Sequence, residues 1–323
     1  MTNREQLLAV KLAALVREHD PASTDLQPGE FGAGAALMAG SSAWVLLDDR
    51  PERGLGAALA WALRHDAKQV NILAEQGAGV LARRAIGWTP PVHVWQIADR
   101  VLRSATPEPL VPSPPLPSAH AELEALIRDS GAEPIVEHGV LRGEVDGLEV
   151  CRVVNDPHTD GVRLEVGVGA HDREAFLLLH GDRPTGEALA DVVRSVREHR
   201  SPGAARHPLN LLAQERALRA QLVADPALIS ASHVRPVAPP IPRANVKDAV
   251  PCVAQATIAS HQVTVVCSTG VDLDVVPFAV DAMAACGTNE CLIVLPARDA
   301  LEIQQRIAAA APGSIAITPL ARP

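Results

Sequence analysis

Runs of consecutive apolar residues alternate with helical apolar patterns near both ends of the chain. The amino-terminal series comprises strands and helices, in alternation, at residues 43–47, 54–65, 69–74, 79–86 and 92–97. The carboxyl-terminal series repeats this alternation at residues 263–267, 274–285, 291–295, 300–311 and 314–318. Near-continuous apolar strands that alternate with helices are typical of parallel sheets covered on both faces. Each series therefore predicts a βαβαβ unit.

Two proline-rich stretches separate these units from the middle of the chain. Residues 106–117 contain six prolines and residues 234–242 contain four, and both stretches predict extended linkers. The expected organisation is an amino-terminal βαβαβ unit at 1–105, a middle α+β domain at 118–233 and a carboxyl-terminal βαβαβ unit at 245–323. The fold class is α/β, with two Rossmann-like units that either join in one sheet or stand apart.

The two units align loosely with each other, and this leaves two interpretations open. They are either a true internal repeat or two uses of the same supersecondary structure. An amphipathic helix is expected at residues 4–19, ahead of the first unit. Residues 31–42 are rich in glycine and alanine, and we expect them to form a connection without regular structure.

Alternating apolar and polar residues predict a three-stranded antiparallel sheet in the middle domain. Asp146-Gly147 separates two alternating runs and is a signal for a two-residue type I′ turn. A turn of two residues places Arg142 opposite Cys151 on the next strand. On the same count Arg152 falls on the buried face, where a charged side chain is a misfit. A third strand at residues 162–168 is expected to pair back on the second.

This register places three carboxylates on one polar face of the sheet. Glu144 lies opposite Glu149, and Glu165 of the third strand joins them. Like charges across a strand pair destabilise it unless they are neutralised, a role open to Arg142. Carboxylate oxygens are the ligands that Mg²⁺ prefers, so the face is a candidate Mg²⁺ site. The alternative is a solvated sheet face, balanced by its arginines.

Helical patterns at residues 119–130 and 185–199 flank the three strands. The order helix, three strands, helix resembles the core of the PD-(D/E)XK nucleases. In that family a sheet carboxylate and an acid-x-Lys on the next strand hold Mg²⁺. This chain has Glu165-Val166-Gly167 and Glu149-Val150-Cys151 at those places, without the lysine that assists the attacking water. The resemblance implies a metal-dependent phosphodiesterase that lacks this helper.

In each βαβαβ unit, one loop follows the first strand. Open parallel sheets bind their ligands beyond the carboxyl ends of their strands, so both loops are candidate sites. The first loop, at residues 48–53, has the sequence Asp-Asp-Arg-Pro-Glu-Arg. The second precedes a helix whose free N–H groups suit an anion. Its candidate ligand-binding residues are Ser268, Thr269, Gly270, Asp272 and Asp274. The alternative is that its two aspartates bind a cation or only cap the helix.

Composition limits the classes of function. A net charge of −9, with aromatic residues at 2% and no tyrosine, disfavours nucleic-acid binding by the chain as a whole. Residues 183–219 hold seven arginines against four acidic residues. This segment is a candidate surface for nucleic acid or an acidic partner, at Arg194, Arg197, Arg200 and Arg206. The alternative is a solvated helix face, or arginines that pair with the chain's own carboxylates.

The remaining reactive residues show no catalytic spacing. The five cysteines form no CxxC pair, which predicts free thiols in a reducing compartment. The histidines near the middle sheet stand at no metal-ligand spacing; they are His138, His158, His171 and His180. Residues 1–18 lack the apolar core of a signal peptide, and no window of about 18 apolar residues would span a membrane. We therefore expect a cytoplasmic protein.

The sequence favours a non-catalytic binding or regulatory protein for a small anionic ligand or a macromolecular partner. Two other hypotheses remain. One is a metal-dependent phosphodiesterase that uses Glu144, Glu149 and Glu165 with Mg²⁺. The other is a structural interaction protein whose polar surfaces bind nothing specific.

Overall fold

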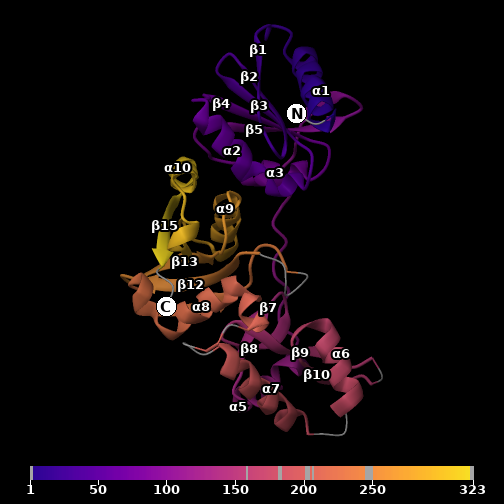
Figure 1. Cartoon of the computed structure of the whole chain (residues 1–323), viewed down its shortest axis with the longest axis vertical. Helices are drawn as coiled ribbons and strands as arrows, with labels where there is room; N and C mark the ends of the chain where they lie inside the picture. Colours follow the sequence, from indigo (N-terminus) through magenta and orange to yellow (C-terminus); the bar gives the residue numbers. More distant parts are fainter. Residues whose placement is uncertain are drawn as a thin grey trace.

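Three sheets, each packed against helices, build a mixed α/β structure (Figure 1). The computed structural model describes residues 3–320, except 158, 181–183, 201–203, 206 and 244–249. The amino-terminal unit, the carboxyl-terminal unit and the middle domain follow one another in space, although the middle domain is central in the sequence. Within the described ranges, no helix combines the length and apolarity needed to cross a membrane.

The amino-terminal unit is a six-stranded sheet with helices on both faces. Its strands are β1 (Leu26–Gly29), β2 (Gly34–Ala39), β3 (Ser42–Leu47), β4 (Gln69–Ala74), β5 (Val92–Ala98) and β6 (Val101–Ser104), in that order. Strands β3, β4 and β5 are parallel and the remaining pairs are antiparallel. Its helices are α1 (Asn3–His19), the short 3-10 helix η1 (Pro51–Arg53), α2 (Leu55–Arg64) and α3 (Ala78–Arg84).

The predicted elements of this unit are present, and the structure adds strands β1, β2 and β6, which we did not expect. Residues 34–39 are strand β2, although we expected only a connection there. The composition concealed this strand because Ala35, Ala36 and Leu37 are small or apolar on both faces. Both faces are buried: Leu37 packs in the cluster under α1, and Ala36 packs in the cluster under α2. A strand covered on both sides shows no alternation.

The carboxyl-terminal unit is a five-stranded sheet with the same kind of cover. Its strands are β11 (His233–Val237), β12 (Cys252–Ile258), β13 (His261–Cys267), β14 (Glu290–Pro296) and β15 (Ser314–Leu320), in that order. Its helices are α8 (Gln214–Ala224), η3 (Pro226–Ile229), α9 (Val275–Cys286), η4 (Ala297–Asp299) and α10 (Glu302–Ala310). Strand β11 occupies part of the expected linker, because Pro236 stands in an edge strand, where proline is tolerated.

The two units share one topology. In each unit the order along the chain is a helix, three strands, and then helix, strand, helix, strand. The first three strands pair antiparallel with one another. The third strand also pairs parallel with the fourth, and the fourth with the fifth. The loops after β3 and β13 have equal lengths, since Gly54 and Asp274 are the N-caps of α2 and α9. Both loops also adopt a positive φ at the same position, 45° at Arg50 and 76° at Gly270. This correspondence favours a true internal repeat, and we call the units the two repeats.

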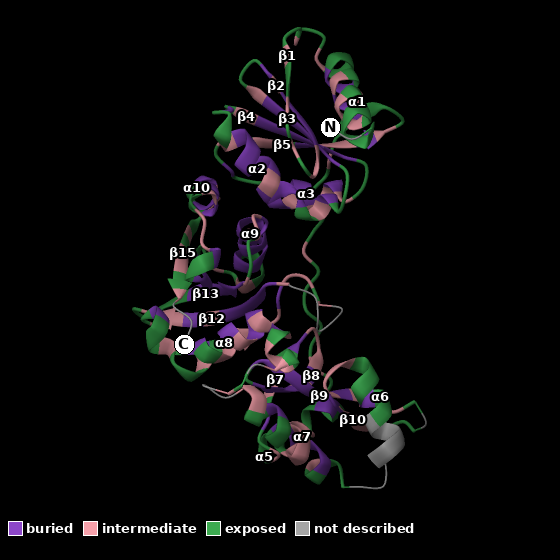
Figure 2. Cartoon of the chain, in the orientation of Figure 1, coloured by how far each residue is buried: buried purple, intermediate pink, exposed green. Residues whose placement is uncertain are grey.

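The repeats form separate sheets that pack through their helices. Helices α2 and α3 of one repeat face α9 and α10 of the other, and their apolar faces form one core (Figures 1 and 2). Leu59 of α2 and Phe278 of α9 belong to this core. The approach is closest at Gly56, where a Cβ would lie 2.1 Å from the Leu273 carbonyl oxygen.

The middle domain is a four-stranded antiparallel sheet packed against helices. Its strands are β7 (Glu133–Glu137), β8 (Val140–Val145), β9 (Leu148–Asn155) and β10 (Val162–Val166), in the order β10-β9-β8-β7. Its helices are α4 (Ser118–Ala121), α5 (Glu124–Asp129), α6 (Gly169–His180), α7 (Thr185–Arg200) and η2 (Pro208–Leu211). The three predicted strands are present, but the sheet has a fourth, β7, that we did not expect.

The predicted register of the β8–β9 hairpin holds only near its turn. Glu144 lies opposite Glu149 as expected, but a β-bulge beside Gly143 then shifts the pairing by one residue. Arg142 therefore lies opposite Arg152, and the expected pairing of Arg142 with Cys151 is wrong. A one-residue shift exchanges the two faces of a strand. The bulge therefore moves Arg152 off the buried face, where the sequence had placed it.

Helix α8 lies between the middle sheet and the carboxyl-terminal sheet. Leu218 and Leu222 pack into the apolar cluster of the carboxyl-terminal sheet. Arg216 and Arg219 point the other way and form ion pairs with the middle sheet. The arginine-rich segment expected within the middle domain is therefore shared between two domains, and α8 joins them.

The close contact between the repeats predicts the effect of one methyl group. Gly56→Ala in α2 directs a Cβ into the Leu273 backbone, and such overpacking costs about 1–3 kcal/mol. In a helix without such a contact, alanine is more stabilising than glycine by about 1 kcal/mol. The sign of the change in the free energy of unfolding therefore shows whether the contact is tight. Urea denaturation should show a lower free energy of unfolding for Gly56→Ala and almost no change for Gly32→Ala, where no atom lies within 4 Å. A stabilised Gly56→Ala variant would contradict the tight repeat interface.

Candidate functional site

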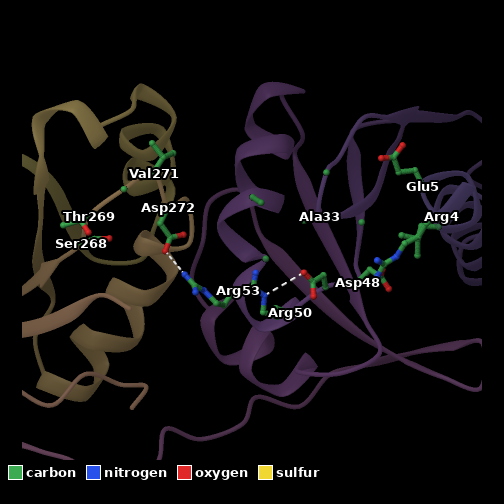
Figure 3. Close-up of a pocket in the computed structure, with 17 residues that line it drawn as sticks. Arg4, Glu5, Ala33, Asp48, Arg50, Arg53, Ser268, Thr269, Val271 and Asp272 are labelled. Atoms are coloured by element: carbon green, nitrogen blue, oxygen red, sulfur yellow. Dashed lines mark hydrogen bonds and ion pairs between the residues drawn. The ribbon is translucent and has the colours of Figure 1, made fainter. Parts of the chain in front are cut away.

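The loops that follow β3 and β13 meet at one cleft between the two repeats (Figure 3). The cleft has a volume of about 770 Å³. Residues 48–50 and 53–54 line one wall, and residues 268–272 line the other. Arg4 and Glu5 of α1 and the glycine-rich turn at 32–34 complete it. The structure thus brings together the two loops that the sequence marked separately as strand-end sites.

Three arginines give the cleft its cationic groups, and each has an acidic neighbour. Arg4 contacts Asp48. The guanidinium of Arg53 lies 2.9 Å from a carboxylate oxygen of Asp272 and bridges the two repeats. Arg50 is held least closely, because its Nε lies 3.9 Å from the neighbouring Asp49. The Arg50 side chain is 71% exposed.

The wall from the second repeat carries no arginine or lysine and is built from small residues. Ser268 is buried, and its backbone N–H donates to the Val294 carbonyl. The Thr269 hydroxyl donates to Glu215 at 2.7 Å. The Gly270 N–H donates to Asp299 at 2.8 Å. These contacts fix the loop and leave open space at Gly270, where a Cβ would meet no atom within 4 Å.

Of the five residues expected to bind a ligand, four line the cleft and Asp274 does not. Asp274 is buried behind the cleft, where its carboxylate accepts the Gly56 N–H at 3.2 Å. The alternative interpretation, helix capping, describes this role, although the capped helix is α2 of the other repeat. Arg84 donates to Asp274 at 3.1 Å and to Asp281 at 2.7 Å. Burial raises the pKa of Asp274 to about 7, against the opposing effect of Arg84.

The three predicted metal ligands lie in ion pairs with arginines. Glu144 and Glu149 are 5% and 3% exposed, so their part of the face is not solvated. Each of the three glutamates has arginine partners: Glu144 with Arg216 at 2.8 Å and Arg219 at 3.2 Å, Glu149 with Arg152 at 3.0 Å, Arg173 at 3.2 Å and Arg142 at 3.4 Å, and Glu165 with Arg163 at 3.0 Å. Within the described ranges, no group of three or more His, Cys, Asp or Glu side chains could hold a metal ion.

Glu137 of β7 is the carboxylate that the sequence did not reveal. It accepts hydrogen bonds from Arg216, from Arg219 at 2.7 Å and from Arg142 at 3.0 Å. Burial alone would raise the pKa of Glu137, but Arg219 and Arg216 hold it below its usual value. No spacing rule connects β7 with α8, because the two are far apart in the sequence. With Glu144, these groups form a buried cluster that we call the clamp: Glu137, Glu144, Arg216 and Arg219.

Three of the four arginines proposed to bind a partner are described. Arg194 pairs with Asp191 at 3.0 Å on the exposed face of α7. Arg197 donates to the Gly131 carbonyl at 2.8 Å, and Arg200 donates to the carbonyls of Leu209 and Asp146. Arg206 lies outside the described residues, as does His158, and the side chain of His180 is not described.

No protein-family model matches this chain, and neither a curated protein nor a solved structure does.

The raised pKa of Asp274 predicts how stability depends on pH. The native state holds this proton up to about pH 7 and the unfolded state only up to about its usual 3.8, so the stability contributed by Asp274 falls as the pH rises from 4 to 7. The free energies of unfolding of the wild type and Asp274→Asn should be compared between pH 4 and 8. The difference in free energy of unfolding, wild type minus variant, should decrease from pH 4 to about pH 7 and level off above pH 7. A difference that increases with pH would show that Arg84 dominates over burial.

The clamp predicts a large loss of stability when one partner is removed. Arg219 is 1% exposed, and Arg219→Met leaves two buried carboxylates short of a partner. Breaking a buried ion pair from one side costs about 3–5 kcal/mol. Circular dichroism during urea denaturation measures this loss, with the exposed Arg194→Met as the control expected within about 0.5 kcal/mol of wild type. A loss below about 1 kcal/mol for Arg219→Met would contradict the role of the clamp.

Proposed function

We propose that this chain is a non-catalytic binding protein whose ligand, a small polar molecule with an anionic group, occupies the cleft between the repeats. The observation that carries the proposal is the meeting of two equivalent strand-end loops at one cleft. Each repeat has a Rossmann-like order of strands and helices, and open α/β sheets bind ligands beyond the carboxyl ends of their strands. A volume of about 770 Å³ suits a small molecule.

Three arginines supply the groups that would bind an anionic ligand, in a lining that also holds the carboxylates of Glu5, Asp48, Asp49 and Asp272. Arg4, Arg50 and Arg53 of the first repeat line it, and Arg53 reaches across to Asp272 (Figure 3). The planar guanidinium presents its donors as a fork that matches the two oxygens of a carboxylate or phosphate. The carboxylates of Asp48 and Asp272 already have arginine partners. They hold the arginines in place until a ligand competes for them.

The lining of the cleft supports binding without catalysis. The residues that line it in the described part of the chain include no histidine, cysteine or lysine. The serine and threonine of the lining have no histidine or lysine beside them there to act as a general base. The alternative of a metal-dependent phosphodiesterase has no observation in its favour among the described residues, because the glutamates of the middle sheet pair with arginines.

A thermal-shift screen followed by hydrogen exchange tests this proposal. A panel of small anionic, neutral and cationic metabolites is screened at millimolar concentration, and a ligand at 100 times its Kd should add about 2.7 kcal/mol of stability. The compounds that raise the melting temperature should then slow amide exchange in both loops, residues 48–54 and 268–272. Protection confined to another part of the chain, or no stabilising compound in the panel, would contradict the proposal.

A further inference from the structure

The repeat provides an internal comparison at the cleft. Arg50 and Gly270 occupy the same position in the two loops, and both have a left-handed backbone, with φ of 45° and 76°. This conformation costs an ordinary L-residue about 1–2 kcal/mol, and glycine almost nothing. The second repeat has the residue that the backbone favours, and the first repeat has an arginine in its place. Arg50 is therefore unfavourable for the fold at this position.

The side chain of Arg50 is mostly exposed, and the backbone carbonyl of Arg50 accepts the Arg53 N–H at 2.9 Å. The Arg50 side chain is 71% exposed, and its ion pair with Asp49 spans 3.9 Å, which is too long for a hydrogen bond. By contrast, Arg53 lies 2.9 Å from Asp272 across the cleft. Strained residues cluster at functional sites, and they also occur in turns of this chain away from the cleft, as at Arg100. Among the three arginines that line the cleft, Arg50 has the weakest contact with a carboxylate and is the readiest to bind an anion.

We propose that Arg50 binds the oxyanion of the ligand, a carboxylate or a phosphate, while the loop at 268–272 contacts its uncharged part. This inference rests on the proposed function and names the group that is recognised. The opposite wall offers the Ser268 hydroxyl, the Thr269 hydroxyl oxygen as an acceptor, since its proton is donated to Glu215, and open space at Gly270. The arginines of the cleft thus lie on one wall, and the charged residue of the loop at 268–272 is Asp272, which is paired with Arg53 (Figure 3). A ligand with an oxyanion at one end and a polar, uncharged body fits this arrangement.

Arg50→Gly separates the two roles of this residue, because it should improve the fold and impair binding. Relief of the left-handed strain should raise the melting temperature of the ligand-free protein by about 1–4 °C. Loss of a charge-assisted contact should weaken binding by about 10- to 100-fold. The probes are inorganic phosphate, ribose 5-phosphate, succinate and ribose, measured by calorimetry on the full chain. The phosphate and carboxylate arms identify the oxyanion, and ribose controls for its absence.

Arg100→Gly is the matched control. Arg100 is an exposed arginine with φ of 69° in the β5–β6 turn, and it does not line the cleft. Its replacement should raise the melting temperature to a similar extent and leave the affinity unchanged. Arg50→Asn provides a second variant, since asparagine tolerates the left-handed conformation and carries no charge. It should bind as weakly as Arg50→Gly.

Each outcome decides the proposal. A higher melting temperature for Arg50→Gly, together with weaker oxyanion binding in both Arg50 variants, supports it. Oxyanion binding that is unchanged in Arg50→Gly, with both loops still protected from exchange, would overturn the role of Arg50 and leave the cleft as the binding site. A lower melting temperature for Arg50→Gly would assign Arg50 a structural role and overturn the inference. If no oxyanion binds while a neutral or cationic metabolite protects both loops, the ligand class is wrong. If nothing protects the loops, the proposed function fails as well.

Discussion

The packing of helix α2 against α9 is the contact on which the cleft depends. Gly56 allows the α2 backbone to approach Leu273 closely, and Asp274 accepts a hydrogen bond from the Gly56 N–H. Asp274 occupies the N-cap position of α9, but its side chain caps α2, the equivalent helix of the other repeat. This arrangement brings the ends of β3 and β13 together and forms a single site from two repeats.

A second constraint holds the middle domain beside the repeats. Helix α8 presents leucines to the carboxyl-terminal sheet and arginines to the middle sheet. Arg216 and Arg219 neutralise Glu137 and Glu144, and all four residues are buried. Two buried carboxylates and two guanidinia are stable there because their charges and hydrogen bonds are matched. The acidic face of the middle sheet is therefore an attachment surface within this chain.

Elements with continuous apolar runs could be predicted from the sequence, because burial on both faces leaves a signal in composition. The strands at 43–47, 69–74 and 263–267 are of this kind. Strand β2 could not be predicted, since its alanines read equally well as a loop. The bulge beside Gly143 also left no signal, and it changed the partner of Arg142. Local patterns in the sequence predict where strands and helices lie. The pairing of the β8–β9 hairpin depends in addition on one bulged residue, which such patterns do not reveal.

The candidate sites show the same division between local and distant information. The strand-end rule identified both loops of the cleft, but their meeting depends on helix packing between repeats that are far apart in the sequence. The polar face of the middle sheet was also predicted, with Glu144 opposite Glu149. Its partners, Arg216 and Arg219, come from α8, which no local pattern relates to that sheet. The alternative that the arginines pair with the chain's own carboxylates describes what the structure shows for these two residues.

Crystals soaked in selenate provide the most direct test of an oxyanion site in the cleft. Selenate is a tetrahedral oxyanion whose selenium can be located by anomalous scattering. The account predicts an anomalous peak within hydrogen-bonding distance of the Arg50 guanidinium, between the loops at 48–54 and 268–272. A cleft without selenate, in crystals where the ion binds at Arg194 or Arg197 of α7, would contradict it.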